Sequence, residues 1–256
     1  MKYITCDENN HVLRIGLNRP DKMNAFNMQM LQELSEAYTL LEQSESLWCG
    51  LLFSHTENFT SGLDLADVAP HVKAGALLFP EKNIDPLRIS GRELTKPVVV
   101  AVQGYCLTIG IELMLAADVC IASEETKFGQ IEVQRGIFPF GGATIRMVQR
   151  AGWGNAMRYM LTGDMFDAKE AYRTDMVQEV VNGHPLDKAV EIADSISKQA
   201  QLGVYAILKS AHLSLTDETG AKAALLATAK KLMDTEDAAE GLQSFLDRRK
   251  AIFIGK

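Results

Sequence analysis

The sequence predicts an α/β body followed by a region made only of helices. Between residues 3 and 181, apolar stretches of strand length alternate with turns and helical stretches, which is typical of layered α/β proteins. Beyond Pro185 only helical patterns remain. A chain of 256 residues, 47% hydrophobic and 23% charged, is long enough to bury a sizeable core. We therefore assign residues 1–185 to an α/β core and residues 186–256 to a helical region.

The first third of the core is expected to contain a hairpin, a helix and a buried strand. Turn-forming residues at 7–10 separate two apolar stretches, which indicates a β-hairpin. Apolar side chains then recur at helical spacing from Met30 to Leu41, which gives a helix with one apolar face. The expected elements are a hairpin at 3–17, a polar loop at 18–25, a helix ending near Ser44, a strand at 47–54 and a loop at 55–65.

Prolines and glycines interrupt the stretch from residue 68 to residue 92. Both residue types stop regular elements, so we expect short helices and a loop. Because loops on a rigid scaffold often carry function, we interpret this stretch as a lid or pocket wall.

Two glutamates stand in apolar surroundings in the middle of the chain. Glu112 lies in a short helix expected at 111–118, between strands expected at 98–102 and 119–122, and Glu132 follows a Gly-Gln turn. A buried, unpaired carboxylate is costly enough to shift its pKa. Two such carboxylates close together are the usual equipment for moving protons.

The elements after Glu132 end in four helices. Their apolar stripes are larger than a short tail needs, which indicates buried contacts between subunits. The expected elements are a turn at 137–142 that starts a helix, a cap at 163–168 before another helix, a strand at 176–181, and helices at 186–200, 204–213, 221–233 and 236–249.

Charge and residue patterns argue against several classes of ligand. The formal net charge of −7 argues against nucleic acid, whose recognition needs a basic face. The five histidines are scattered and lack the spacing of metal ligands, so no metal site is predicted. The apolar run at residues 98–122 is interrupted by Gln103, Glu112 and Asp118, which favours a buried strand–helix–strand over a membrane span.

The cysteines indicate a reducing, cytoplasmic environment. They form no C-x-x-C pair, and three of them lie in apolar runs, as expected of buried free thiols. The N-terminus lacks the apolar core of a signal peptide. The four cysteines are Cys6, Cys49, Cys106 and Cys120.

Residues 104–113 (GYCLTIGIEL) and 128–132 (FGQIE) resemble the signature of the crotonase (enoyl-CoA hydratase/isomerase) superfamily. Glu132 follows Glu112 by 20 residues, the spacing of the two catalytic glutamates in that family's hydratases. The resemblance implies a right-handed spiral of ββα units, with C-terminal helices that pack trimers, which pair into hexamers. Stretches resembling the family's first CoA loop, oxyanion loop and C-terminal helix follow in the family's order at 18–25, 59–65 and 245–250.

The resemblance implies two backbone donors for an oxyanion, the N–H groups of Leu63 and Ile109. A thioester that becomes an enolate needs aligned donors to meet its negative charge. Gly62 allows a turn that points the first donor inward, and the free N–H groups at a helix start supply the second. The chain departs from the family at residues 108–110, Thr-Ile-Gly, where hydratases usually carry a run of glycines.

The implied reaction is the reversible addition of water to a 2-enoyl-CoA thioester. In the family's hydratases the residue matching Glu112 activates the water, and the residue matching Glu132 delivers a proton to Cα. One alternative is another reaction of the family through the same enolate, chiefly double-bond isomerisation or an acyl-CoA dehydratase or lyase reaction. A second is a catalytically silent or RNA-binding homologue, against which the acidic charge and both intact glutamates argue.

The resemblance also implies how CoA is held, and no cofactor is expected beyond the CoA moiety of the substrate. Lys22 is a candidate for the phosphates, and Arg248, beside Phe245, for the nucleotide bound to a neighbouring subunit of a trimer or hexamer. The alternative is that these basic residues are solvated surface charge. The full set implied for CoA and substrate is Lys22, Ala25, Ser61, Leu63, Asp64, Leu65, Phe245 and Arg248.

Overall fold

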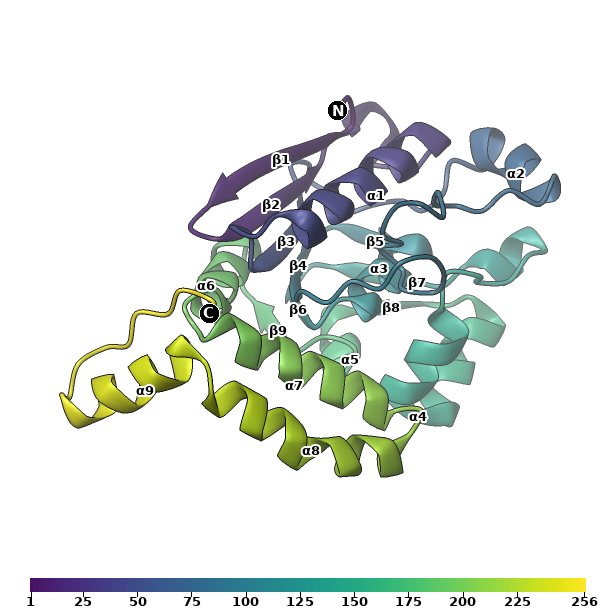
Figure 1. The fold of residues 1–256 in the computed structure, drawn as a ribbon. Helices are drawn as coiled ribbons and strands as arrows, with labels where there is room; N and C mark the ends of the chain where they lie inside the picture. The colour runs from purple at the N-terminus through teal and green to yellow at the C-terminus, as the bar shows by residue number, and fades with distance from the viewer.

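Nine strands form two sheets in the computed structural model, which describes residues 1–256 (Figure 1). The larger sheet has the strand order β1-β2-β3-β4-β6-β9, and the smaller has the order β5-β7-β8. Neighbouring strands pair in parallel except for β1 with β2 and β7 with β8. The strands are β1 (Ile4–Asn9), β2 (Val12–Leu17), β3 (Cys49–Ser54), β4 (Val98–Val102), β5 (Tyr105–Leu107), β6 (Val119–Ser123), β7 (Lys127–Gly129), β8 (Met165–Asp167) and β9 (Glu179–Val181).

Helices cover the sheets and make up most of the C-terminal part of the chain (Figure 1). The predicted α/β body with C-terminal helices is therefore present. The helices are α1 (Met28–Gln43), α2 (Leu65–Lys73), α3 (Ile109–Ala116), α4 (Ala143–Thr162), α5 (Ala168–Arg173), α6 (Leu186–Ile196), α7 (Gln201–Ser214), α8 (Glu218–Met233) and α9 (Glu236–Leu246), with short 3-10 helices η1 (Pro20–Lys22) and η2 (Glu132–Arg135).

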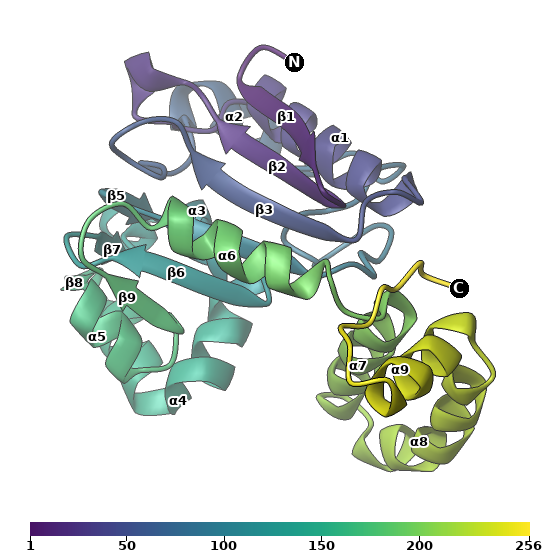
Figure 2. The same ribbon diagram turned by 90° about the vertical axis from the view of Figure 1, so that its left-hand side faces the viewer.

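The larger sheet is buried on both faces, as its continuous apolar strands predict. Alternate side chains of β4 enter different cores because successive side chains of a strand point to opposite faces. Val98, Val100 and Val102 join the core that contains α1 and α3. Val99 and Ala101 join a smaller core that contains α6, and Figure 2 shows α6 lying across the sheet.

The α/β body extends beyond the boundary predicted at residue 185. Ala189 and Ala193 of α6 are fully buried against the sheet. Figure 2 shows α7, α8 and α9 as a lobe that stands apart from both sheets. The division therefore lies between α6 and α7, because α6 packs on β3 and β4.

None of the helices is both long and apolar enough to cross a membrane.

The hairpin turn lies later than the sequence predicted. Asn10 and His11 form the turn with φ values of 49° and 67°, whereas Asp7 and Glu8 lie inside β1. Because β1 is the edge strand of the larger sheet, its exposed polar side chains do not interrupt it. The turn prediction at residues 7–10 was wrong for this reason.

Residues 163–168 contain a strand that the sequence did not predict. Gly163 ends α4 in the left-handed conformation, with φ 67°. β8 follows and pairs antiparallel with β7. Asp167 then caps α5, as predicted, by accepting a hydrogen bond from the Glu170 N–H at 2.9 Å.

Candidate active site

Glu112 lies in the first turn of α3, and every residue of that helix is buried. Its side chain is 4% exposed, and its Oε1 accepts hydrogen bonds from the N–H groups of Gly141 at 2.7 Å and Ala143 at 3.2 Å. A Cβ on Gly141 would lie 2.2 Å from Glu112 Oε2, so a side chain there would displace this carboxylate. The start of α4 therefore fixes one oxygen of this carboxylate.

Glu132 begins η2 and is 7% exposed. Its Oε1 accepts a hydrogen bond from the Gln130 Nε2 group at 2.9 Å. Its Oε2 and the Gln130 Oε1 atom are buried without a hydrogen-bond partner in the chain. Glu132 thus has one oxygen held by the protein and one available to a bound molecule.

Burial raises the pKa of both glutamates to about 7. For Glu112 the hydrogen bonds from Ala143 and Gly141 oppose this effect, and the negative charge of Glu132 adds to it. The structure therefore brings both predicted glutamates into one electrostatic neighbourhood. Near neutral pH each can either give or take a proton.

Two backbone N–H groups, those of Leu63 and Ile109, have no acceptor within the chain. The Phe26 N–H donates to Gly62 O, and the Asp64 N–H donates to Phe26 O, each at 2.8 Å, so the Leu63 N–H points away from Phe26. Ile109 is the first residue of α3, and its N–H has no carbonyl one turn earlier. These are the two donors that the sequence resemblance implied.

The loop before Leu63 is tied to the strand before Ile109. The Thr60 hydroxyl donates to Asn24 O at 2.7 Å and accepts from the Gly62 N–H at 3.0 Å. The Leu107 N–H in β5 donates to Thr60 O at 3.1 Å. The segments that carry the two donors are therefore parts of one hydrogen-bonded unit.

The predicted pocket wall reaches Glu112. Residues 68–92 form most of α2 and then an irregular segment, in which buried Asp85 accepts hydrogen bonds from the N–H groups of Leu87 and Ile89. A Cβ on Gly141 would lie 2.9 Å from Leu87 Cδ1, so Leu87 packs beside the Glu112 carboxylate.

The chain is similar to known proteins over nearly its whole length. The family model described as enoyl-CoA hydratase/isomerase matches residues 7–256. The chain belongs to the enoyl-CoA hydratase/isomerase family. The predicted crotonase-type α/β fold with C-terminal helices is thereby confirmed.

Relatives within the enoyl-CoA hydratase/isomerase family bear different names. An enoyl-CoA hydratase of Mycobacterium tuberculosis is 31% identical over 249 residues, which is 95% of this chain and 93% of that protein. A 1,2-epoxyphenylacetyl-CoA isomerase of Escherichia coli is 30% identical over 261 residues and 100% of both chains. The crystal structure of a probable enoyl-CoA hydratase/isomerase from Mycobacterium abscessus has a TM-score of 0.96 and 48% identity, covering 100% of this chain and 99% of that one.

Most of the residues predicted to hold CoA meet around one loop. Ser61 contacts the η1 segment, since its hydroxyl donates to Lys22 O at 3.3 Å. Asp64 accepts from Arg19 Nη1 at 3.0 Å, and the same nitrogen donates to Ala25 O at 2.6 Å. Leu65, which begins α2, follows this cluster and is 39% exposed.

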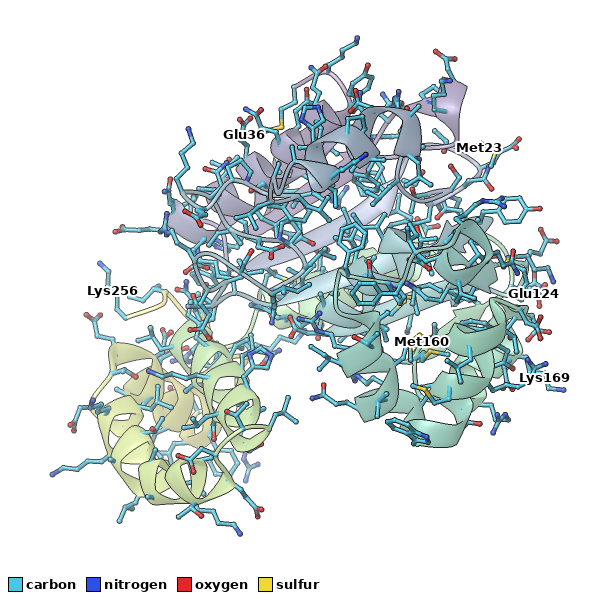
Figure 3. All side chains as sticks on the ribbon, turned by 90° about the vertical axis from the view of Figure 1, so that its right-hand side faces the viewer. Met23, Glu36, Glu124, Met160, Lys169 and Lys256 are labelled. Atoms are coloured by element: carbon cyan, nitrogen blue, oxygen red, sulfur yellow. The ribbon has the colours of Figure 1, made fainter.

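The other two predicted residues lie elsewhere in the chain. Phe245 is in α9, and Arg248 follows that helix, in the lobe that Figure 2 shows apart from the sheets. In Figure 3, Met23 of the predicted CoA loop and Lys256 of the C-terminal lobe lie on opposite sides of the molecule. A single chain therefore does not bring the two parts of the predicted CoA site together.

Three functional residues were missed because their partners are distant or their types are common. Gln130 holds Glu132, Gly141 holds Glu112, and Arg19 links Ala25 to Asp64. Gln130 and Arg19 each had a signal in the sequence, since Gln130 stands within the FGQIE stretch and Arg19 within the stretch at 18–25.

Proposed function

We propose that this chain catalyses the reversible addition of water to a 2-enoyl-CoA thioester. The observation that carries the proposal is the pair of buried glutamates, Glu112 and Glu132, with pKa values of about 7. They accompany two unpaired backbone N–H groups, those of Leu63 and Ile109. Proton transfer and oxyanion stabilisation together are what this reaction requires.

In the proposed reaction the thioester oxygen accepts hydrogen bonds from Leu63 and Ile109. Loss of one such donor typically costs about 3 kcal/mol of transition-state stabilisation. Glu112, fixed at Oε1 by two backbone N–H groups, takes a proton from water as the oxygen bonds to Cβ. Glu132 gives its proton to Cα through the oxygen that the chain leaves unpaired, and the enolate collapses to the thioester.

This chemistry needs no cofactor beyond the CoA moiety of the substrate. The two carboxylates transfer both protons, and backbone N–H groups stabilise the negative charge of the enolate oxygen. We place CoA along the segment of Lys22, Ala25 and Ser61, where exposed Lys22 can reach a phosphate. The predicted cytoplasmic location stays a prediction.

We also propose that the chain works as a trimer or hexamer. The C-terminal lobe exposes large apolar side chains that water would not favour. A neighbouring subunit could cover them and bring its Phe245 and Arg248 to the CoA nucleotide. The most exposed ones are Ile207, Leu215, Leu225, Leu226, Met233, Leu242, Phe245, Leu246 and Ile252, each at least 56% exposed.

The test of the reaction is an assay with 2-butenoyl-CoA, in which hydration is measured as the loss of enoyl-thioester absorbance. We expect Glu112→Gln and Glu132→Gln each to lower kcat by at least about 10²-fold while the fold is retained. The same preparations should be offered 3-butenoyl-CoA. A wild-type chain that isomerises this substrate without ever hydrating the 2-enoyl product would replace the hydratase proposal with an isomerase.

A further inference from the structure

Thr108 has a backbone conformation that glycine adopts and β-branched residues avoid. Its φ is 50° and its ψ is −112°, outside the regions open to most L-residues. Such a conformation persists only where the surroundings determine it, and it concentrates at functional sites. Here the Thr108 N–H donates to Gly129 O at 2.9 Å, which ties the residue to the end of β7.

The side chain of Thr108 lies against Gly62. A Cβ on Gly62 would lie 2.4 Å from Thr108 Oγ1, so this hydroxyl oxygen packs over the Gly62 Cα. The hydroxyl has no hydrogen-bond partner in the chain, and Thr108 is half-buried. Its contact with Gly62 is therefore a packing contact.

The two residues in this contact precede the two free N–H donors. The Leu63 N–H belongs to the peptide plane that begins at Gly62, and the Ile109 N–H belongs to the plane that begins at Thr108. A change in the separation of Gly62 and Thr108 would therefore change the separation of the two donors.

We propose that Thr108 is a positioning residue that sets the spacing of the Leu63 and Ile109 N–H groups through its contact with Gly62. The inference rests on the proposed function of these groups as oxyanion donors. One enolate oxygen must be within reach of both, and a displacement of about 1 Å can cost 10²-fold in rate. Thr108 thus affects the charged transition state more than the neutral substrate.

The test compares Thr108→Ala, which removes the atom in contact with Gly62, with Thr108→Ser, which keeps it. Two probes that need no hydration are used: acetoacetyl-CoA, whose enolate carries charge on the thioester oxygen, and uncharged butanoyl-CoA. We expect Thr108→Ala to weaken enolate binding and to lower kcat by about tenfold or more. Binding of butanoyl-CoA should change less than about twofold, and Thr108→Ser should restore the wild-type values.

Thr108→Val separates packing from hydrogen bonding, because it fills the space over Gly62 without a hydroxyl. Enolate binding near that of the wild type supports positioning by contact. If Thr108→Val loses as much as Thr108→Ala, the hydroxyl itself donates to the ligand and the inference is overturned. It is also overturned if Thr108→Ala binds the enolate normally. A wild type that binds the enolate but never hydrates 2-butenoyl-CoA would refute the proposed function and leave this comparison valid.

Discussion

Glu112 is an ionisable side chain in a helix whose eight residues are all buried. Two backbone N–H groups favour its charged form. Burial and the nearby Glu132 carboxylate favour its neutral form and raise its pKa to about 7. At alkaline pH, the charge on Glu112 therefore lowers the stability of the folded chain.

Glu112→Gln should for this reason stabilise the folded chain at pH 8 and change its stability little at pH 4. Folding raises the pKa from 4.5 to about 7, so the protonated form favours folding, and that contribution is lost as pH rises through 7. The gain at pH 8 is up to about 3 kcal/mol. Gln can still accept the hydrogen bonds from Gly141 and Ala143.

Urea unfolding at both pH values measures this difference. Glu124→Gln is the control, because Glu124 lies at the surface (Figure 3) and should show no such pH dependence. If the gain from Glu112→Gln were equal at pH 4 and pH 8, Glu112 would be ionised in the folded chain without cost.

At this scale the sequence predicted the groups that can react but not what holds them. Glu112 and Glu132 follow from their spacing and their apolar neighbours. The hydrogen bond from Gly141 to Glu112 spans 29 residues and depends on how α4 packs on α3. No local pattern contains that information.

Among the elements, α7 is joined to the pocket wall by a hydrogen bond that requires a neutral histidine. Arg88 Nη1 lies 3.3 Å from His212 Nε2. Because a guanidinium can only donate, the histidine nitrogen must accept. Arg88 also donates to Asp118 at 3.2 Å. Burial, Arg88 and Arg146 lower the pKa of His212, while Asp118 and Glu93 oppose them.

Lowering the pH should loosen this contact. Since folding lowers the pKa of His212 below 6.5, the stabilisation is present above pH 6.5 and is lost as pH falls through the folded-state pKa. Hydrogen exchange in residues 88–96 and α7 should therefore be faster at pH 5.5 than at pH 7.5, after correction for intrinsic rates. His212→Gln, which can still accept from Arg88 but does not titrate, should abolish the difference. Equal acceleration in that variant would assign the change to another group.

Elements were predictable where the periodicity of apolar residues determines them. They were less predictable where pairing with a distant strand determines them. The helix expected to end near Ser44 is α1, whose apolar face packs on the larger sheet. β8 has only three residues and exists because β7 offers an edge. In the sequence pattern α6 resembles the three helices after it, but its alanines allow it to approach the sheet closely.

For the whole molecule, the separation of the predicted CoA residues leads to a prediction about assembly. Lys22 and Ser61 lie on the α/β body, and Phe245 and Arg248 lie on the C-terminal lobe, so the proposed nucleotide site, which uses both parts, would require two chains. Light scattering at micromolar concentration should give three or six times the chain mass. Leu226→Glu should lower that mass. Because Leu226 is 82% exposed in the single chain, its substitution should weaken contacts between subunits without destabilising the fold. A stable wild-type monomer would contradict the prediction that two chains share the nucleotide site.

Arg248 is the residue of the lobe that we propose for binding a neighbour's CoA. Arg249 beside it is paired with Glu240 at 2.6 Å, whereas the Arg248 side chain is exposed and makes no ion pair in the chain. A protein with net charge −7 needs such a local cation to hold an anionic nucleotide.

Arg248→Glu should therefore raise KM for CoA thioesters and leave kcat nearly unchanged, because the nucleotide is remote from the reacting carbons and is bound equally in the ground and transition states. Lys198→Glu on the surface after α6 makes the same change in net charge and should leave KM unaltered. The defect should vanish with a pantetheine thioester, which has no nucleotide, and should shrink with added salt, since exposed charges are screened over about 8–10 Å. An unchanged KM for the full CoA thioester would mean that Arg248 is solvated surface charge, and Lys22 would then be the residue to replace next.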